Sequence, residues 1–124
     1  MALCLAAGAV SAVLAINSFT LAWMHSIERL RWEEDWRVDA GQLQLVAARI
    51  KGSGAGMEPP DDAVLQGGAW HYRPRVAAMD RLTLAHSPYT AGYELCADGA
   101  CRMLADYLPG IEESATIVLA ACRE

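Results

Sequence analysis

The sequence predicts an all-β fold, a single-domain antiparallel β-sandwich or small barrel of about seven or eight short strands over residues 1–124. Two observations lead to this prediction. Several short segments alternate between apolar and polar residues, which is the pattern of a strand with one buried face. Glycine, proline, asparagine and aspartate interrupt the chain at short intervals, as turns between strands do. One segment, residues 103–108, is suited instead to a helical turn.

Composition and charge agree with a compact domain and exclude two classes of protein. Of the 124 residues, 54% are hydrophobic and 20% are charged, so the chain can form a core and is not intrinsically disordered. The formal net charge is −5, and only 10 lysines and arginines are spread along the chain. This distribution lacks the basic surface by which proteins bind nucleic acids, so we expect no nucleic-acid partner.

The beginning of the chain allows more than one interpretation, because residues 1–27 contain no Asp, Glu, Lys or Arg. A secretory signal peptide carries basic residues before its apolar run, and none precedes this one. A membrane helix needs about twenty continuous apolar residues, whereas polar residues interrupt this segment. We therefore expect two folded strands, at residues 3–7 and 19–25, with turns at Gly8 and Asn17. A signal peptide or a membrane segment is the alternative.

The next segment predicts a hairpin. Residues 32–38 alternate, a turn follows at residues 39–41, and residues 43–50 form the returning strand. One face of the first strand carries Trp32, Glu34, Trp36 and Val38, and the other carries Glu33, Asp35 and Arg37. We expect the second face, including the Glu33 side chain, to lie in solvent. The long loop that follows, at about residues 51–69, is rich in glycine and proline, and we expect no regular structure there.

Shorter strands are predicted in the second half of the chain. Residues 70–76 should form an edge strand, because Pro74 has no N–H to donate to a neighbouring strand. The dipeptide Asp98-Gly99 is a preferred centre of a type I′ hairpin turn. Further strands are expected at residues 82–86, 93–96, 101–104 and 116–122.

Four cysteines are placed so that two disulfides can form. With a two-residue turn at the Asp-Gly dipeptide, Cys96 and Cys101 face each other at a non-hydrogen-bonded position, where Cα atoms are about 4.5 Å apart. Cys4 and Cys122 lie in the first and last predicted strands, and terminal strands often pair. Two disulfides imply an oxidising compartment. Free, buried cysteines are the alternative, since cysteine is commonly buried as a small apolar residue.

The candidate site consists of polar residues predicted on apolar strand faces. Alternation places His25 among apolar residues and Glu34 between Trp32 and Trp36. A buried carboxylate is costly unless it is paired or protonated, so we expect Glu34 to pair with His25. Arg29 and Arg31 are the alternative partners. Such a pair is either an acid/base or ligand-binding dyad, or a structural pair that fixes the strand register.

Other motifs carry weaker signals. Ser26 follows His25 directly, but neighbours in a strand point to opposite faces and no Gly-x-Ser-x-Gly elbow is present, so we do not expect a serine nucleophile. The loop containing Gly54 and Gly56 lacks the Gly-Lys-Ser/Thr ending of a phosphate-binding loop, which leaves a turn or a lid over a small ligand. The cysteines and histidines lack metal-ligand spacing. We expect no metal and no cofactor.

Three motifs carry a resemblance to a known family: Trp-Met-His-Ser-Ile-Glu at residues 23–28, Trp-Glu-Glu-Asp-Trp at 32–36 and Gly-Ala-Gly-Met at 54–57. With them the chain resembles a small bacterial family of unknown function, numbered 1850. The residues that match its pattern position by position are His25, Ser26, Glu34, Trp36, Gly54 and Gly56. The resemblance covers most of the chain.

The resemblance implies a context and no enzyme activity. Genes of this family typically lie beside those of tripartite ATP-independent periplasmic (TRAP) transporters of the TAXI class, whose binding proteins capture organic acids outside the inner membrane. We therefore expect an accessory binding or interaction module, periplasmic or membrane-associated through its N-terminus or the transporter, with transporter subunits or a small organic ligand as partners. The alternative is a small hydrolase or isomerase that uses His25 and Glu34 as an acid/base pair.

Overall fold

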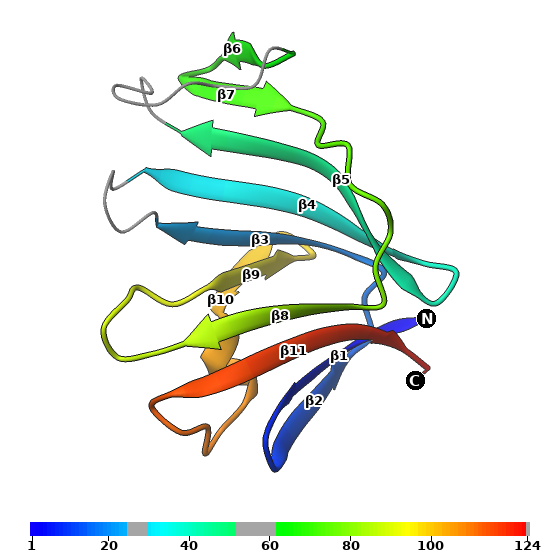
Figure 1. The fold of residues 1–124 in the computed structure, drawn as a ribbon, viewed down its shortest axis with the longest axis vertical. Coiled ribbons are helices and arrows are strands. Elements are labelled where there is room, and N and C mark those ends of the chain that lie inside the picture. Colours follow the sequence, from blue (N-terminus) through cyan, green and yellow to red (C-terminus); the bar gives the residue numbers. More distant parts are fainter. Residues whose placement is uncertain (25–29, 52–61, 124) are drawn as a thin grey trace.

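A computed structural model describes residues 1–24, 30–51 and 62–123, and these residues form two antiparallel sheets that face each other (Figure 1). The smaller sheet has four strands in the order β2-β1-β11-β8, and the larger has seven in the order β10-β9-β3-β4-β5-β7-β6. The strands are β1 (Ala2–Ala7), β2 (Val10–Leu14), β3 (Ser18–Met24), β4 (Arg31–Asp39), β5 (Gln42–Lys51), β6 (Val64–Gln66), β7 (Ala69–Tyr72), β8 (Arg81–His86), β9 (Glu94–Ala97), β10 (Ala100–Met103) and β11 (Ala115–Cys122). The predicted all-β sandwich is confirmed, and the sheets do not close into a barrel.

The expected number of about seven or eight strands was too low: strands are present at all nine segments named from the sequence, and two more were not foreseen. The first is β2, which returns antiparallel along β1 after a turn at Gly8, whose φ of 60° favours glycine. The second is β6, which lies inside the segment that we expected to lack regular structure. It pairs with β7 through a turn at Gly67 and Gly68, both at positive φ.

The strand predicted at residues 70–76 is shorter than expected and is not an edge. It corresponds to β7, which ends at Tyr72, and β6 covers its outer side. After β7 the chain continues in the same direction, antiparallel to the first half of β5. There Leu43 and Met79 exchange backbone hydrogen bonds of 2.8 and 2.9 Å. The prediction failed because Pro74 ends the pairing with β5 instead of marking a sheet edge.

The core lies between the two sheets. Phe19 of β3 and Trp36 of β4 stack at 6.5 Å between ring centroids, facing the smaller sheet. The 3-10 helix η1 (Leu104–Tyr107), close to the predicted helical turn, adds the buried Leu104. The largest fully buried side chains come from both sheets and from the segment around η1: Leu3, Leu5, Leu21, Leu43, Ile50, Leu95, Leu104, Leu108, Ile117 and Leu119.

The N-terminal residues form three of these strands, in agreement with the expectation that they are folded. Strand β1 lies inside the smaller sheet between β2 and β11, and its Leu3 and Leu5 are fully buried. Figure 1 shows the two chain ends close together on the same side of the molecule. In the described ranges no helix has the length and apolar character needed to cross a membrane.

A bulge in β5 explains how this strand keeps one face on the core. Asp35 pairs with Ala47 but the next residue, Trp36, pairs with Leu45, so Val46 has no partner on β4. The extra residue shifts the alternation by one position. As a result Leu45 before the bulge and Ala48 after it both point to the core side.

Candidate functional site

Strand β4 separates two different environments. We call the side of the larger sheet that looks toward the smaller sheet the inner face, and the opposite side the outer face. Trp36 and Val38, both buried, mark the inner face, and alternation places Trp32 and Glu34 with them. Glu33 and Asp35 lie on the outer face.

Glu34 is a half-buried carboxylate on the inner face. Its cross-strand neighbours are Leu21 on β3 and Ala48 on β5, neither of which offers a polar group. Its Oε1 accepts a long hydrogen bond of 3.4 Å from Nε1 of Trp36, two residues further along β4. Burial raises the pKa of Glu34, and the bond from Trp36 offsets only part of this effect.

Aromatic side chains lie on the same face of the larger sheet as this carboxylate. Trp23 of β3 stacks on Trp32 with 6.1 Å between ring centroids and contacts the Tyr93 ring at 5.7 Å. Tyr72 of β7 pairs with Ala48, the neighbour of Glu34. Burial raises the pKa of both tyrosines, and the charge of Glu34 raises it further, so both hydroxyls lie within the field of this carboxylate. We call the set Glu34, Trp23, Trp32, Trp36, Tyr72 and Tyr93 the aromatic site.

A further indole lies on the same face beside the aromatic site. Trp70 of β7 pairs with Ile50, which in turn pairs with Trp32. Its Nε1 is buried and has no acceptor in the part of the chain that the structure describes. A buried donor without an acceptor is costly.

The structure brings together some of the residues singled out from the sequence. Glu34 lies between Trp32 and Trp36 on one strand face, as the alternation indicated. Arg31 was expected as an alternative partner of Glu34, and this expectation is wrong. Arg31 points to the outer face and binds Glu33 and Glu94 instead. The remaining expected residues lie outside the described residues: His25, Ser26, Arg29, Gly54 and Gly56.

The tyrosines and Trp70 were missed as site residues. Trp70 and Tyr72 stand two residues apart in a predicted strand, so alternation alone would have placed them on one face. Only the pairing of β5 with β7 shows that this is the face of Glu34. Tyr93 comes just before β9, and no periodicity in the sequence locates it.

The outer face carries a network of ion pairs centred on Glu33. This carboxylate is only 7% exposed and accepts hydrogen bonds from Nε of Arg31 at 2.8 Å and Nε of Arg49 at 2.7 Å. Lys51 Nζ lies 3.6 Å from Glu33 Oε2. The expectation that Glu33 lies in solvent is therefore wrong. Its outward direction was inferred correctly, but the cations that cover it come from β5 and from a residue two positions earlier.

The network continues on both sides of Glu33. Arg49 also donates to Asp35 at 2.8 and 3.1 Å, and Thr20 donates to Asp35 at 2.7 Å. Arg31 also donates to Glu94 at 2.8 Å. Burial alone would raise the pKa of Glu33 and Asp35, but the arginine hydrogen bonds outweigh it and lower both. These charges therefore satisfy one another and leave little binding capacity.

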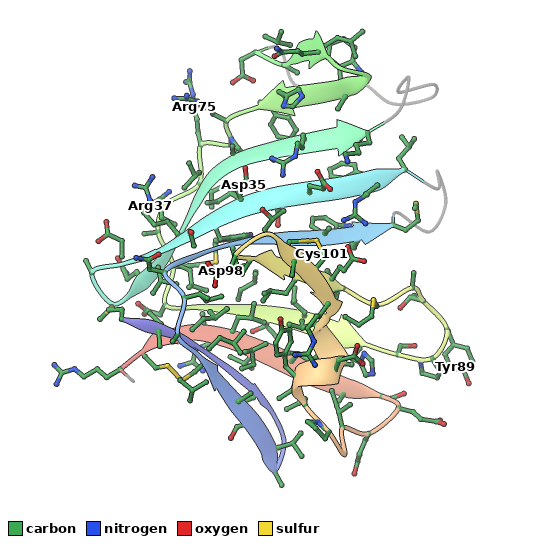
Figure 2. The ribbon with its side chains drawn as sticks, turned by 180° about the vertical axis from the view of Figure 1, so that it is seen from behind. Asp35, Arg37, Arg75, Tyr89, Asp98 and Cys101 are labelled. Atoms are coloured by element: carbon green, nitrogen blue, oxygen red, sulfur yellow. A yellow bond between two sulfur atoms is a disulfide. The ribbon has the colours of Figure 1, made fainter. Side chains whose placement is uncertain are left out.

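Arginines outside this network remain exposed. Arg37 and Arg75 extend into solvent from the same side of the molecule (Figure 2), and neither has an ion pair with a described residue. The amide of Gln44, the cross-strand neighbour of Arg37, donates to the backbone carbonyl of Val76 at 3.3 Å. This bond ties the segment that carries Arg75 to β5.

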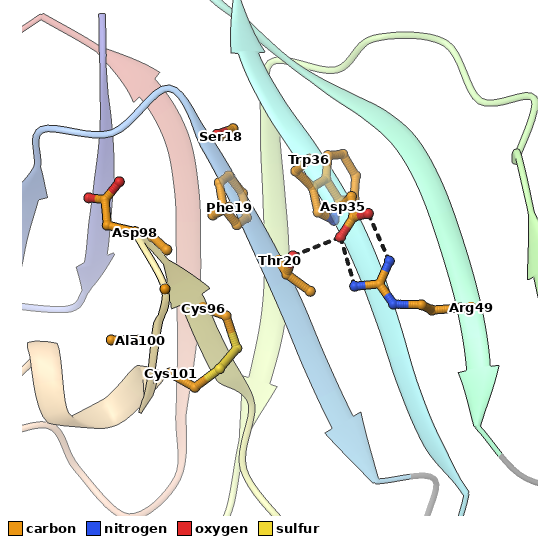
Figure 3. A pocket seen from close by; sticks show the side chains of 12 residues that line it. Ser18, Phe19, Thr20, Asp35, Trp36, Arg49, Cys96, Asp98, Ala100 and Cys101 are labelled. Atoms are coloured by element: carbon orange, nitrogen blue, oxygen red, sulfur yellow. Dashed lines mark hydrogen bonds and ion pairs between the residues drawn. A yellow bond between two sulfur atoms is a disulfide. The ribbon is translucent and has the colours of Figure 1, made fainter. Parts of the chain in front are cut away.

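A hollow of about 590 Å³ lies on the outer face, beside the hairpin of β9 and β10 (Figure 3). Its polar lining includes Ser18 and Asp98 as well as Thr20, Asp35 and Arg49, and the last three are bonded to one another. The Cys96–Cys101 disulfide forms part of its wall. The only ion pair that lines the hollow, among the described residues, is thus already formed between Asp35 and Arg49.

Both disulfides expected from the sequence are present. Cys96 and Cys101 pair across the hairpin with Cα atoms 4.0 Å apart, and the turn residues Asp98 and Gly99 both have positive φ, as a type I′ turn requires. Cys4 and Cys122 join β1 to β11. Glu94 lies close enough to the first pair to suggest a metal site, but both sulfurs are bonded to each other and do not act as ligands.

The fold and site define a disulfide-bonded β-sandwich whose larger sheet carries a half-buried carboxylate among aromatic side chains. The model of the family described as a domain of unknown function (DUF1850) matches residues 19–104, and the chain belongs to this family. The matched segment runs from β3 to the start of η1 and includes the whole aromatic site. No curated protein and no solved structure matches the chain.

Proposed function

We propose that this protein is a binding module of a TAXI-class TRAP solute-uptake system, and that a small organic ligand occupies its aromatic site. The observation that carries the proposal is Glu34: a half-buried carboxylate with aromatic neighbours and no cation from the described residues. Ligand sites are mainly apolar and aromatic with a few convergent polar groups, and the inner face has this character.

The disulfides support the setting of the proposal. All four cysteines are paired, and one pair joins the first and last strands. Disulfides persist in oxidising compartments such as the periplasm, which is where the binding proteins of TAXI-class transporters work. Family membership supports the association with transporter genes, and transporter subunits are therefore the proposed protein partners.

Co-purification at the native expression level tests the association. The protein is tagged at its chromosomal locus, extracted with mild detergent under non-reducing conditions, and its partners are identified by mass spectrometry. We expect transporter subunits to be enriched over an untagged strain. The control variant is Arg123→Ala, at an exposed position that follows β11 of the smaller sheet. It should still co-purify with the transporter subunits. Failure to enrich any transporter subunit with the folded protein would refute the association.

A hydrolase or isomerase is the second candidate function, favoured by the raised pKa of Glu34. A carboxyl group that stays protonated closer to neutral pH is a better general acid. The test is a screen with ester and isomerisable substrates, comparing Glu34→Gln with Glu33→Gln. If Glu34 is the general acid, Glu34→Gln should lower the catalytic rate by about 100-fold or more, whereas Glu33→Gln should not. Equal activity in both variants would exclude this role of Glu34.

A further inference from the structure

We propose that the ligand of the aromatic site is an organic cation, with the Glu34 carboxylate as its counter-ion and the surrounding rings as its walls. The proposal rests on the binding function proposed above but not on the association with a transporter. The ligand class is a molecule that carries an ammonium or quaternary ammonium group.

The first argument is the distribution of charge across the larger sheet. The basic residues of β4 and β5 all lie on the outer face: Arg31, Arg37, Arg49 and Lys51. Three of them are engaged with Glu33, Asp35 or Glu94. Glu34 points the opposite way and meets no cation of the described residues. Within the part of the chain that the structure describes its charge therefore has no counter-ion, which is unusual for a half-buried carboxylate.

The second argument is the nature of the walls. The Trp23 ring contacts Trp32 at 6.1 Å and Tyr93 at 5.7 Å between centroids. The faces of aromatic rings carry partial negative charge and attract cations within about 6 Å, and cages of such rings bind quaternary ammonium groups. These rings and Glu34 are partly exposed, so a ligand can reach them from solvent.

Other ligand classes fit the site less well. An anion would be repelled by Glu34 and by the ring faces. A neutral apolar molecule would cover the carboxylate without pairing it, which adds to the cost of burial. An organic cation both pairs the carboxylate and contacts the rings. The same features therefore select positive charge and apolar surface in one molecule.

The test uses choline, tetramethylammonium and ethanolamine as probes, because the ligand itself is not identified. The purified full-length protein is titrated with each chloride salt at constant ionic strength, and binding is followed by calorimetry and tryptophan fluorescence. Sodium chloride controls for salt, and the neutral alcohol with carbon in place of the choline nitrogen controls for apolar contact. We expect saturable binding of at least one cation and much weaker binding of the neutral alcohol.

The variants separate the site from the rest of the sheet. Glu34→Gln keeps the size of the side chain and should weaken cation binding by about tenfold or more. Glu33→Gln, on the outer face of the same strand, and Glu112→Gln, on an exposed loop, should leave it unchanged. Circular dichroism verifies that each variant is folded. If Glu33→Gln does not fold, Glu112→Gln alone provides the charge control.

Three results would overturn the proposal. They are the absence of saturable binding for all three cations, equal binding of choline and its neutral analogue, and equal affinity in Glu34→Gln and the unchanged protein. The association with the transporter fails separately, when co-purification finds no subunit although Glu34-dependent cation binding is observed. The reverse result, subunits without cation binding, refutes the ligand class and leaves the association standing.

Discussion

Glu33 and Glu34 are adjacent in the sequence but lie on opposite faces of β4, in opposite electrostatic environments. Glu33 is covered by Arg31, Arg49 and Lys51, whereas Glu34 accepts one long bond from Trp36. Burial acts on both carboxyl groups, but only Glu33 has cations that reverse its effect. The pKa of Glu33 is therefore lowered and that of Glu34 raised. The opposite shifts of two neighbouring carboxyl groups thus follow from the different environments on the two faces of β4.

The first prediction concerns stability. Glu33→Ala should destabilise the protein by about 2 kcal/mol, because it removes the centre of the outer-face network. The cost stays below the roughly 3–5 kcal/mol of breaking an isolated buried pair, since Arg31 keeps Glu94 and Arg49 keeps Asp35. Glu34→Ala should cost less than about 1 kcal/mol, because an unpaired charge is lost with the side chain. Urea unfolding measures both.

This ranking is the reverse of the one that follows from the sequence-based expectation of Glu33 in solvent and Glu34 in a buried pair. Asp62→Ala, at an exposed position, is the control and should change stability by less than about 0.5 kcal/mol. A larger loss for Glu34→Ala than for Glu33→Ala would mean that Glu34 has a strong partner. Such a result would also remove the basis of the cation-binding proposal.

The second prediction is the pH dependence of Glu34→Gln. Since the pKa of Glu34 is raised above its ordinary value of 4.5, the folded protein binds its proton more tightly than the unfolded chain. Protonation of Glu34 therefore adds to the free energy of unfolding. This contribution is fully present below pH 4.5 and is lost as the pH rises through the pKa of Glu34 in the folded protein. Glu34→Gln should therefore be more stable than the unchanged protein at neutral pH.

The difference should disappear below the ordinary pKa, where both side chains are neutral. Tyr72 and Tyr93, the titratable groups that feel the charge of Glu34, have raised pKa values and stay protonated in this range. Glu33 and Asp35 titrate in both proteins and cancel in the comparison. Urea unfolding across the pH range provides the data. A constant difference at every pH would contradict the assigned environment.

Local patterns in the sequence predicted the β4–β5 and β9–β10 hairpins and the two faces of β4. The Asp98-Gly99 turn fixed the register that pairs Cys96 with Cys101, because a type I′ turn leaves only one alignment of its strands. Strand β2 was not predicted, since both of its faces carry apolar residues and its sequence shows almost no alternation in polarity. Strand β6 was missed because three residues are too few to form a pattern.

The candidate site was predicted only in part, and for a physical reason. Alternation gives the direction of a side chain but not the residues that arrive from other strands. It placed Glu34 with Trp32 and Trp36, yet Tyr72 and Tyr93 join this site through β7 and the segment before β9. It pointed Glu33 outward, yet Arg49 and Lys51 reach it from β5. The pairing of β4 with β5 and β5 with β7, and of β3 with β9, brings these residues together, and the sequence does not encode such pairing locally.

The third prediction compares the two disulfides. Cys4 and Cys122 are separated by 118 residues, and Cys96 and Cys101 by 5. Closing a long loop restricts the unfolded chain more, so the first bond should stabilise by about 5 kcal/mol and the second by about 2 kcal/mol. Replacing each pair by alanines and measuring thermal unfolding tests this order. Equal losses would show that native contacts, and not chain entropy, dominate the effect.

The fourth prediction concerns the turn between β4 and β5. Ala40 and Gly41 form this turn with φ values of 51° and 78°. A left-handed conformation costs an ordinary residue such as alanine roughly 1 kcal/mol or more, whereas asparagine tolerates it. Ala40→Asn should therefore stabilise the protein by about 1 kcal/mol. The side chain at this position is exposed, so the substitution disturbs no packing.

The hairpin of β9 and β10 provides the matched control, because its turn has the same geometry with a better residue. Asp98 occupies the corresponding position with φ of 52°, and Gly99 follows at 80°. Asp98→Ala should therefore destabilise by about the amount that Ala40→Asn stabilises. Both variants are measured by urea unfolding with the disulfides intact. If Asp98→Ala loses stability while Ala40→Asn gains none, residue 40 does not hold the left-handed conformation in solution. The hairpin that carries both glutamates of β4 would then close through a different turn.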